Sequence, residues 1–202
     1  MDNYKIEKRI FDFFLASALF FLAFPLFLYL FLLIKIDSKG KIIYKSERTG
    51  LNEKKFFMYK FRSMISRADK LGFMSASDDD VRITKIGKLI RKYKLDELPE
   101  LINIIKGEMS FVGPRPELEY YTRQFNKEEK KILSVKPGIT DFASIKFHNE
   151  GEILKNSKIK DKNKAYELLI QPEKTKLQLK YIKEASFLLD LKLILNTIKL
   201  FL

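Results

Sequence analysis

Two adjacent acids, Asp96 and Glu97, are the side chains of this sequence best suited to catalysis. On a regular helix, neighbouring side chains point about 100° apart, so these two carboxylates would not share a proton as a facing pair does. They therefore suit two different roles. If Asp96 lies at the start of a helix, the exposed N–H groups and the helix dipole keep it ionised, which suits a nucleophile or a Mg²⁺ ligand. The same position equally suits an N-cap, and the spacing leaves both interpretations open.

Three cations could bring phosphate to these acids. Arg115 lies between Pro114 and Pro116, which hold its backbone rigid, and its planar guanidinium matches the oxygens of a phosphate. Lys60 and Arg62 alternate along a predicted strand, so we expect both on one face, where they would also bind phosphate. An internal salt bridge for Arg115, and a solvated strand face for the other two, would explain the same residues.

Two helices predicted from the apolar spacing must position the acids. Residues 84–93 form a basic amphipathic helix, and Arg91 is among the cations opposite its apolar side. Residues 95–107 form the next helix, with Pro99 in its first turn and Gly107 as its C-cap. This assignment places the first of the two acids at the N-terminus of the second helix.

Two further elements complete the predicted fold, which is helix-rich and mixed α/β. Residues 42–64 predict a β-hairpin with Gly50 and Asn52 in its turn. Residues 186–202 carry apolar side chains along one helical stripe, which suits either a core helix or an amphipathic helix lying in a membrane interface.

Residues 13–34 form a run without a charged side chain. A helix of this length is long enough to cross about 30 Å of hydrocarbon. Pro25 interrupts this run and predicts a kink. Basic residues flank both ends, so the positive-inside bias selects neither end as the outer one. A kinked spanning helix and a re-entrant helix with both ends on the cytoplasmic side remain open. We expect residues 1–36 to form a re-entrant membrane anchor and residues 37–202 a single domain.

The composition limits the partners and the metals. The net charge is +13, from 39 Lys plus Arg against 26 Asp plus Glu, and beside an apolar anchor this excess favours anionic lipid or anionic substrates. No nucleic-acid-binding motif accompanies the basic residues, so no nucleic-acid partner is expected. The absence of cysteine and the single His148 exclude thiolate and multi-histidine metal sites. Any metal must therefore be held by oxygen.

Five sequence features occur in an order and with a spacing that resemble those of a known family. They are the proline-broken anchor, YKFRSM at 59–64, LDELPEL at 95–101, KGEMSFVGPRP at 106–116, and KPGIT at 136–140. Together they resemble the small monotopic phosphoglycosyl transferases, also called bacterial sugar transferases. The resemblance covers most of the chain.

The resemblance implies a membrane enzyme that transfers a phospho-sugar from a UDP-sugar to polyprenol (undecaprenyl) phosphate and releases UMP. This reaction starts glycoconjugate assembly at the cytoplasmic face of the bacterial inner membrane. By the resemblance, Asp96 attacks the sugar-linked phosphorus to form a covalent phosphoglycosyl-aspartate, with Mg²⁺ on the diphosphate and Asp96 as its ligand. Glu97 would either position the metal or deprotonate polyprenol phosphate. Arg115 would bind substrate phosphate, and we expect Lys60, Arg62 and Arg91 to assist.

Some residues depart from the family pattern, and these limit the prediction. Phe24 precedes the anchor proline where the family commonly has serine, and His148 takes the place of a common arginine. Gln178 falls where a Tyr-Asp pair is common. The transferred sugar and the glycan pathway are therefore not predicted, and the sequence leaves a homodimer open. A non-catalytic, membrane-anchored basic domain that binds anionic lipid or a partner protein is the alternative from another class.

Overall fold

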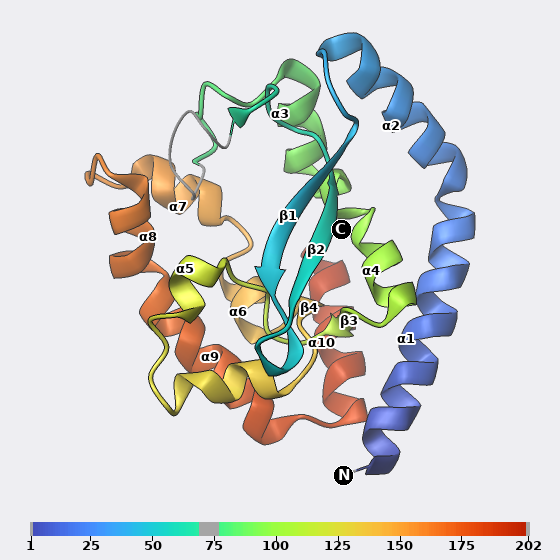
Figure 1. The fold of residues 1–202 in the computed structure, drawn as a ribbon, viewed down its shortest axis with the longest axis vertical. Coiled ribbons are helices and arrows are strands. Elements are labelled where there is room, and N and C mark those ends of the chain that lie inside the picture. The colour runs from blue at the N-terminus through green and yellow to red at the C-terminus, as the bar shows by residue number, and fades with distance from the viewer. Residues whose placement is uncertain (1, 69–76, 201–202) are drawn as a thin grey trace.

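Helices dominate the structure, and short strands join them into a mixed α/β fold (Figure 1). The computed structural model describes residues 2–68 and 77–200. In these ranges the elements, with η for 3₁₀ helices, are α1 (Asp2–Leu22), α2 (Phe24–Asp37), β1 (Ile43–Thr49), η1 (Leu51–Glu53), β2 (Lys55–Phe61), α3 (Lys85–Lys92), η3 (Leu95–Glu97), α4 (Glu100–Lys106), β3 (Ser110–Val112), α5 (Glu119–Thr122), η4 (Glu129–Ser134), β4 (Gly138–Thr140), α6 (Phe142–Lys146), α7 (Glu150–Asn156), α8 (Lys162–Leu169), α9 (Gln171–Glu184) and α10 (Phe187–Lys199). The expected helix-rich, mixed α/β class is confirmed.

The predicted hairpin is formed by β1 and β2, which pair antiparallel from Ile43 opposite Phe61 to Thr49 opposite Lys55. Its turn passes through Asn52, whose backbone lies in the left-handed region at a φ of 54°. The short polar side chain of asparagine makes this conformation less costly than it is for most residues. The hairpin is therefore correctly predicted from the turn residues, and β2 carries Lys60 to the centre of the protein.

The strands β3 and β4 form a second pair, which is parallel, with Val112 opposite Thr140. Just beyond β3, a Cβ atom placed on Gly113 would come within 2.4 Å of the carbonyl oxygen of Lys136. Only glycine fits such a close backbone contact. The contact fixes the direction in which the chain leaves β3 and enters the proline-flanked loop of Arg115.

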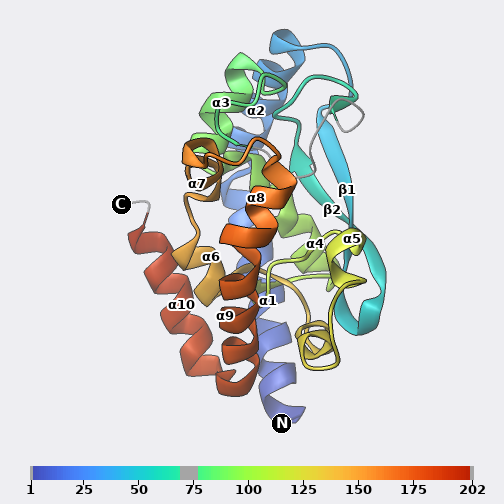
Figure 2. The same cartoon turned by 90° about the vertical axis from the view of Figure 1, so that its left-hand side faces the viewer.

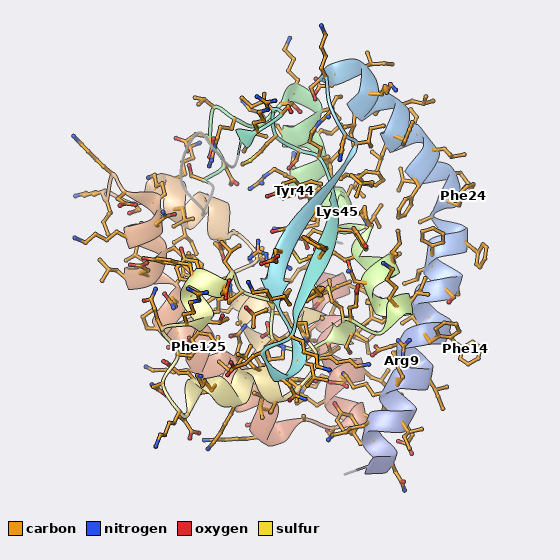
Figure 3. All side chains as sticks on the ribbon, in the orientation of Figure 1. Arg9, Phe14, Phe24, Tyr44, Lys45 and Phe125 are labelled. Carbon is orange, nitrogen blue, oxygen red and sulfur yellow. The ribbon has the colours of Figure 1, made fainter. Side chains whose placement is uncertain are left out.

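The N-terminal apolar segment forms α1 and α2, which meet at Ala23 with a bend of 60°. Pro25 lies in the first turn of α2, where its missing N–H removes no intrahelical hydrogen bond, so the chain bends where the kink was predicted. In the part of the chain that the structure describes, no single helix combines the length and the apolar character needed to cross a membrane, whereas the bent pair taken together does. Phe14 and Phe24 point away from the protein on the outer side of the pair (Figure 3).

The inner faces of α1 and α2 pack along one side of the molecule (Figures 1 and 2). Ala16 of α1 belongs to the main hydrophobic core, together with side chains from β2 and α4. Leu30 and Ile34 of α2 belong to a second core with β2 and α3. The segment expected as the anchor, residues 1–36, and the remaining residues 37–202 therefore share their hydrophobic cores.

Two cations near the start of α1 also bind the protein interior. Arg9 donates hydrogen bonds to the carbonyl oxygens of Ile104, at 2.6 Å, and Ile105, at 2.7 Å, in the last turn of α4. Lys8 forms an ion pair with the buried Asp190 of α10. Carbonyls in the last turn of a helix lack intrahelical partners and favour a positive charge. Lys8 and Arg9, two of the basic residues that precede the apolar run, thus hold α1 against the rest of the protein.

Arg62 lies elsewhere than expected. Its guanidinium donates hydrogen bonds to the carbonyl oxygens of Lys41, at 2.7 Å, Ser38, at 2.5 Å, and Ile34, at 3.2 Å. These bonds hold the C-terminal end of α2 and the chain that follows it. Because β2 ends at Phe61, the strand alternation does not extend to Arg62, and the expectation that it faces phosphate beside Lys60 is corrected.

We predict that Arg62→Met lowers the free energy of unfolding by about 3 kcal/mol, because it removes several charge-assisted hydrogen bonds from buried carbonyl groups. Arg123→Met is the matched control, since the Arg123 side chain is 74% exposed and, among the described residues, pairs only with Glu119 in its own turn. Denaturant unfolding in detergent micelles measures the difference. Equal stability of the two variants would show that Arg62 does not secure α2.

Candidate active site

A short irregular connection carries the two acids. After α3 the chain turns at Lys94, whose φ of 54° is a left-handed conformation that is costly outside glycine. The 3₁₀ turn η3 then contains Asp96 and Glu97, and α4 begins only at Glu100. The prediction of a regular helix starting at the first acid is therefore wrong by one turn. The predicted C-cap is correct, since Gly107 ends α4 with a φ of 81°.

The acids face a cavity of about 760 Å³ at the centre of the molecule. Five of the residues expected in the site line this cavity: Asp96, Glu97, Lys60, Arg91 and Arg115. They come from β2, α3, η3 and the loop after β3, which are far apart in the sequence. Arg62 does not line the cavity, in keeping with its contacts to α2.

Glu97 is held by two cations. The Arg115 guanidinium pairs with it through both nitrogens of its fork, and Lys60 Nζ donates a hydrogen bond to Glu97 Oε1 at 2.7 Å. Burial acts to raise the pKa of Glu97, but the charges of Arg115 and Lys60 outweigh burial and hold that pKa well below its ordinary value. Glu97 is therefore ionised, and both of its oxygens are occupied. A carboxylate in this state is a weak proton acceptor.

Arg115 forms the internal salt bridge that the sequence left open. Its side chain nevertheless remains 25% exposed and lines the cavity, so part of the guanidinium faces the space that a ligand would fill. Gln178 of α9 donates a hydrogen bond to the Arg115 carbonyl oxygen at 3.4 Å. Gln178 is one of the residues that depart from the family pattern, and the structure places it behind the Arg115 loop.

Asp96 is the acid that stays free. Its carboxylate makes no hydrogen bond or ion pair with any residue in the described ranges, although only 6% of the residue is exposed. Burial raises the pKa of Asp96, and the nearby charge of Lys60 acts against this rise. Burial, rather than the helix dipole predicted from the sequence, is thus the main influence on Asp96. A carboxylate without partners at a cavity wall can bond to a ligand.

A third acid, Glu100, lies behind these two and was not singled out from the sequence. It is fully buried, its closest cation is Lys60 at 3.4 Å, and neither of its oxygens has a hydrogen-bond partner among the described residues. Burial raises the pKa of Glu100 from 4.5 to about 7. Its spacing of three residues from Glu97 is the signal that could have placed both carboxyl groups on one side of a helix.

The acids were tested as a metal site. In the described ranges, no three acidic or histidine side chains converge as metal ligands. Mg²⁺, however, is commonly held by one or two carboxylates together with substrate phosphate oxygens and water. Asp96 supplies one such carboxylate at the cavity wall, whereas Glu97 is already occupied by cations. The residues fit a Mg²⁺ ion that arrives with a phosphate ligand and takes Asp96 as its protein ligand.

One wall of the cavity, next to the acids, is basic. It is formed by α3 and the turn after it, and its members are Lys88, Arg91, Lys92 and Lys94. None of these four cations forms an ion pair within the described part of the chain. Unpaired cations along a concave wall attract and hold anionic groups.

Another part of the cavity lining contains an ion-paired group that sequence reasoning missed. Lys174 Nζ lies 2.6 Å from Glu117 Oε1 and 2.8 Å from the Tyr166 hydroxyl, which itself donates to Glu117 at 2.8 Å. All three side chains are well buried and line the cavity. His148 lines it too, from the segment where the sequence departs from the family pattern. The partners come from the loop after β3, from α8 and from α9, so no local spacing indicates them.

Comparisons with known proteins match nearly the whole chain to one family. The family model described as "Bacterial sugar transferase" matches residues 3–202. The chain is 34% identical to a UDP-N-acetylgalactosamine-undecaprenyl-phosphate N-acetylgalactosaminephosphotransferase of Aeromonas hydrophila, over 97% of this chain and 44% of that protein. It is 32% identical to a UDP-glucose:undecaprenyl-phosphate glucose-1-phosphate transferase of Escherichia coli (strain K12), over 96% of this chain and 40% of that protein.

A third relative is closer in length. The chain is 35% identical to the uncharacterized sugar transferase EpsL of Bacillus subtilis (strain 168), over 96% of this chain and 86% of that protein. The chain thus spans less than half the length of the two relatives whose names state a reaction, and most of the length of the third.

We predict that Glu100→Gln stabilises the protein increasingly as the pH rises. In the folded wild type the Glu100 pKa of about 7 lies above the ordinary 4.5, so its contribution to stability is present below pH 4.5 and is lost as the pH rises through 7. Glutamine keeps the shape and does not ionise. The variant should match the wild type near pH 4.5 and exceed it by about 3 kcal/mol above pH 8, in unfolding free energies measured by denaturant titration.

The exposed Glu184→Gln serves as the control and should follow the wild type at every pH. Parallel pH profiles for Glu100→Gln and the wild type would show that Glu100 does not carry the proton within this cluster.

Proposed function

Because the chain belongs to the bacterial sugar transferase family, we propose that it transfers a phospho-sugar from a UDP-sugar to polyprenol (undecaprenyl) phosphate and releases UMP. The observation that carries the proposal is the Asp96 carboxylate, which is unpaired within the described ranges and faces a cavity with a basic wall. A domain that only binds anionic lipid has no use for a free carboxylate among its cations. The geometry therefore favours an enzyme over the non-catalytic alternative.

In the first step, an Asp96 oxygen attacks the sugar-linked phosphorus of the donor. A new O–P bond forms, the bond between the two phosphorus groups breaks, and UMP leaves with its electron pair. The donor diphosphate is negatively charged, so a carboxylate reaches it only after cations have reduced the repulsion. Arg91 and Arg115 line the cavity and suit this task. A bound Mg²⁺, held by Asp96 and the diphosphate, would supply further charge neutralisation.

In the second step, a phosphate oxygen of the acceptor attacks the phosphoglycosyl-aspartate and frees Asp96. A phosphate monoester loses its second proton with a pKa of about 6, so the acceptor already arrives ionised near neutral pH. The reaction then needs no general base. Glu97, with its depressed pKa and two bound cations, is accordingly assigned to holding Arg115 and Lys60 in place rather than to proton transfer.

We place the catalytic site at the cytoplasmic face of the bacterial inner membrane, with α1 and α2 inserted as a re-entrant pair. The outer faces of both helices expose large apolar side chains, as does α10. The most exposed are Phe14, Phe21, Leu22, Ile36 and Leu188. The bend of 60° lets both ends of the pair lie on one side when the two helices are tilted in the membrane, and the relatives' undecaprenyl substrates require contact with lipid.

The proposed reaction is tested by incubating purified protein with Mg²⁺, polyprenol phosphate and a panel of UDP-sugars. We expect UMP release with at least one donor, and we expect Asp96→Asn to fall to background because an amide is a poor nucleophile. Asp79→Asn, at an exposed acid outside the cavity lining, should retain activity. An active Asp96→Asn variant would remove Asp96 from the mechanism, and no UMP with any donor would contradict the reaction itself.

The re-entrant arrangement predicts that both ends of the α1–α2 pair react with an impermeant thiol reagent from the same side. The chain has no cysteine, so Asn3→Cys and Lys39→Cys each provide a single label. Lys39 is preferred to Ser38, whose hydroxyl bonds to Arg62 at 2.9 Å. In oriented membrane vesicles, labelling of the two variants from opposite sides would establish a spanning helix instead.

A further inference from the structure

The cavity has an apolar section next to its charged centre. Leu101 of α4 lies one helical turn beyond Glu97, and it is joined there by Ile139 of β4, Ala143 of α6 and Leu200 at the end of α10. The elements β4, α6 and α10 are neighbours in space, and α6 and α10 lie side by side in Figure 2. The apolar section therefore begins beside the Glu97 and Arg115 pair.

The threonines in this section do not offer free polar groups to a ligand. The hydroxyls of Thr140 and Thr197 lie 2.6 Å apart in a hydrogen bond, and Thr197 also donates to the Leu193 carbonyl oxygen at 2.8 Å. Both hydroxyls are therefore already bonded within the protein and are not free to bind a ligand. The chemistry of this part of the wall thus favours an apolar group over a sugar or a nucleotide.

The section also has an opening. Leu200 lines the cavity and is nevertheless 39% exposed, so the cavity meets the surface at the C-terminal end of α10. Ile198 is exposed on the outer face of the same turn, and Leu188 is exposed near the other end of the helix. Exposed apolar side chains of α10 therefore accompany the cavity lining at Leu200.

A ligand that matches both parts must have an anionic head and an apolar chain. The cations Arg91 and Arg115 suit the head, and the section of Leu101, Ile139, Ala143 and Leu200 suits the chain. The UDP-sugar donor is polar along its whole length and lacks such a chain. The lipid acceptor has one, directly attached to its phosphate.

We propose that this apolar section holds the first isoprenoid units of the lipid acceptor, and that the remaining chain leaves past Leu200 toward the membrane. The inference rests on the proposed function for the identity of the acceptor. It adds a location and an exit path for its chain. Contact along the first units would bring the acceptor phosphate to the Asp96 side of the cavity in a fixed orientation.

The test compares isopentenyl, geranyl and farnesyl phosphate as water-soluble acceptors and ligands. Wild-type protein should bind farnesyl phosphate at least tenfold more tightly than isopentenyl phosphate, because more apolar surface is buried. Leu200→Asp and the milder Ile139→Ala should each reduce this ratio about tenfold. Leu168→Asp, at an exposed apolar position of α8 outside the cavity lining, should keep it.

Two readouts separate this inference from the proposed function. Isothermal titration calorimetry with the donor-free protein measures acceptor binding without turnover, and UMP release from donor alone measures the first step without acceptor. Both variants should retain donor-only UMP release. An unchanged ratio of farnesyl to isopentenyl binding in both variants would overturn the inference. If the wild type released no UMP but still bound farnesyl phosphate more tightly than isopentenyl phosphate, only the proposed function would be overturned.

Discussion

The buried contact of Glu97 with Arg115 and Lys60 is the interaction on which the site depends. It joins η3, the proline-flanked loop after β3, and β2, which are three separate segments of the sequence. A buried ion pair returns little net stability, but removal of one partner leaves an unpaired charge that costs about 3–5 kcal/mol. By occupying Glu97 completely, the contact leaves Asp96 as the acid available to a ligand. Two adjacent carboxylates thus acquire different chemistry from their neighbours.

The α1–α2 pair and the site are built as one unit. Arg9 of α1 binds the last turn of α4, the helix that begins at Glu100, while Arg62, next to the strand of Lys60, binds the end of α2. Each arginine supplies charge to carbonyl groups that a helix leaves unpaired at its C-terminus. The α1–α2 pair is therefore bound to the elements that carry the acids. This arrangement suits a reaction in which one substrate stays in the membrane.

The sequence predicted the local features well, because each depends on neighbours in the chain. The bend near Pro25, the hairpin turn at Asn52 and the C-cap at Gly107 all follow from backbone preferences. Contacts between residues distant in the sequence were harder to predict. Strand alternation placed Arg62 beside Lys60, but the strand ends one residue earlier, and nothing local indicates that α2 lies close enough to bind it. The buried position of Glu100 likewise depends on tertiary packing, which no single sequence displays.

The role of Asp96 as nucleophile can be tested by a single measurement. Wild-type protein is incubated with Mg²⁺ and an accepted UDP-sugar in the absence of polyprenol phosphate, and the intact protein and its peptides are then weighed by mass spectrometry. The account predicts a mass gain of one phospho-sugar on the peptide that contains Asp96. Glu97→Gln should form the same adduct more slowly, because its cations are no longer held in place. An adduct on a different residue, or turnover without any adduct, would contradict the account.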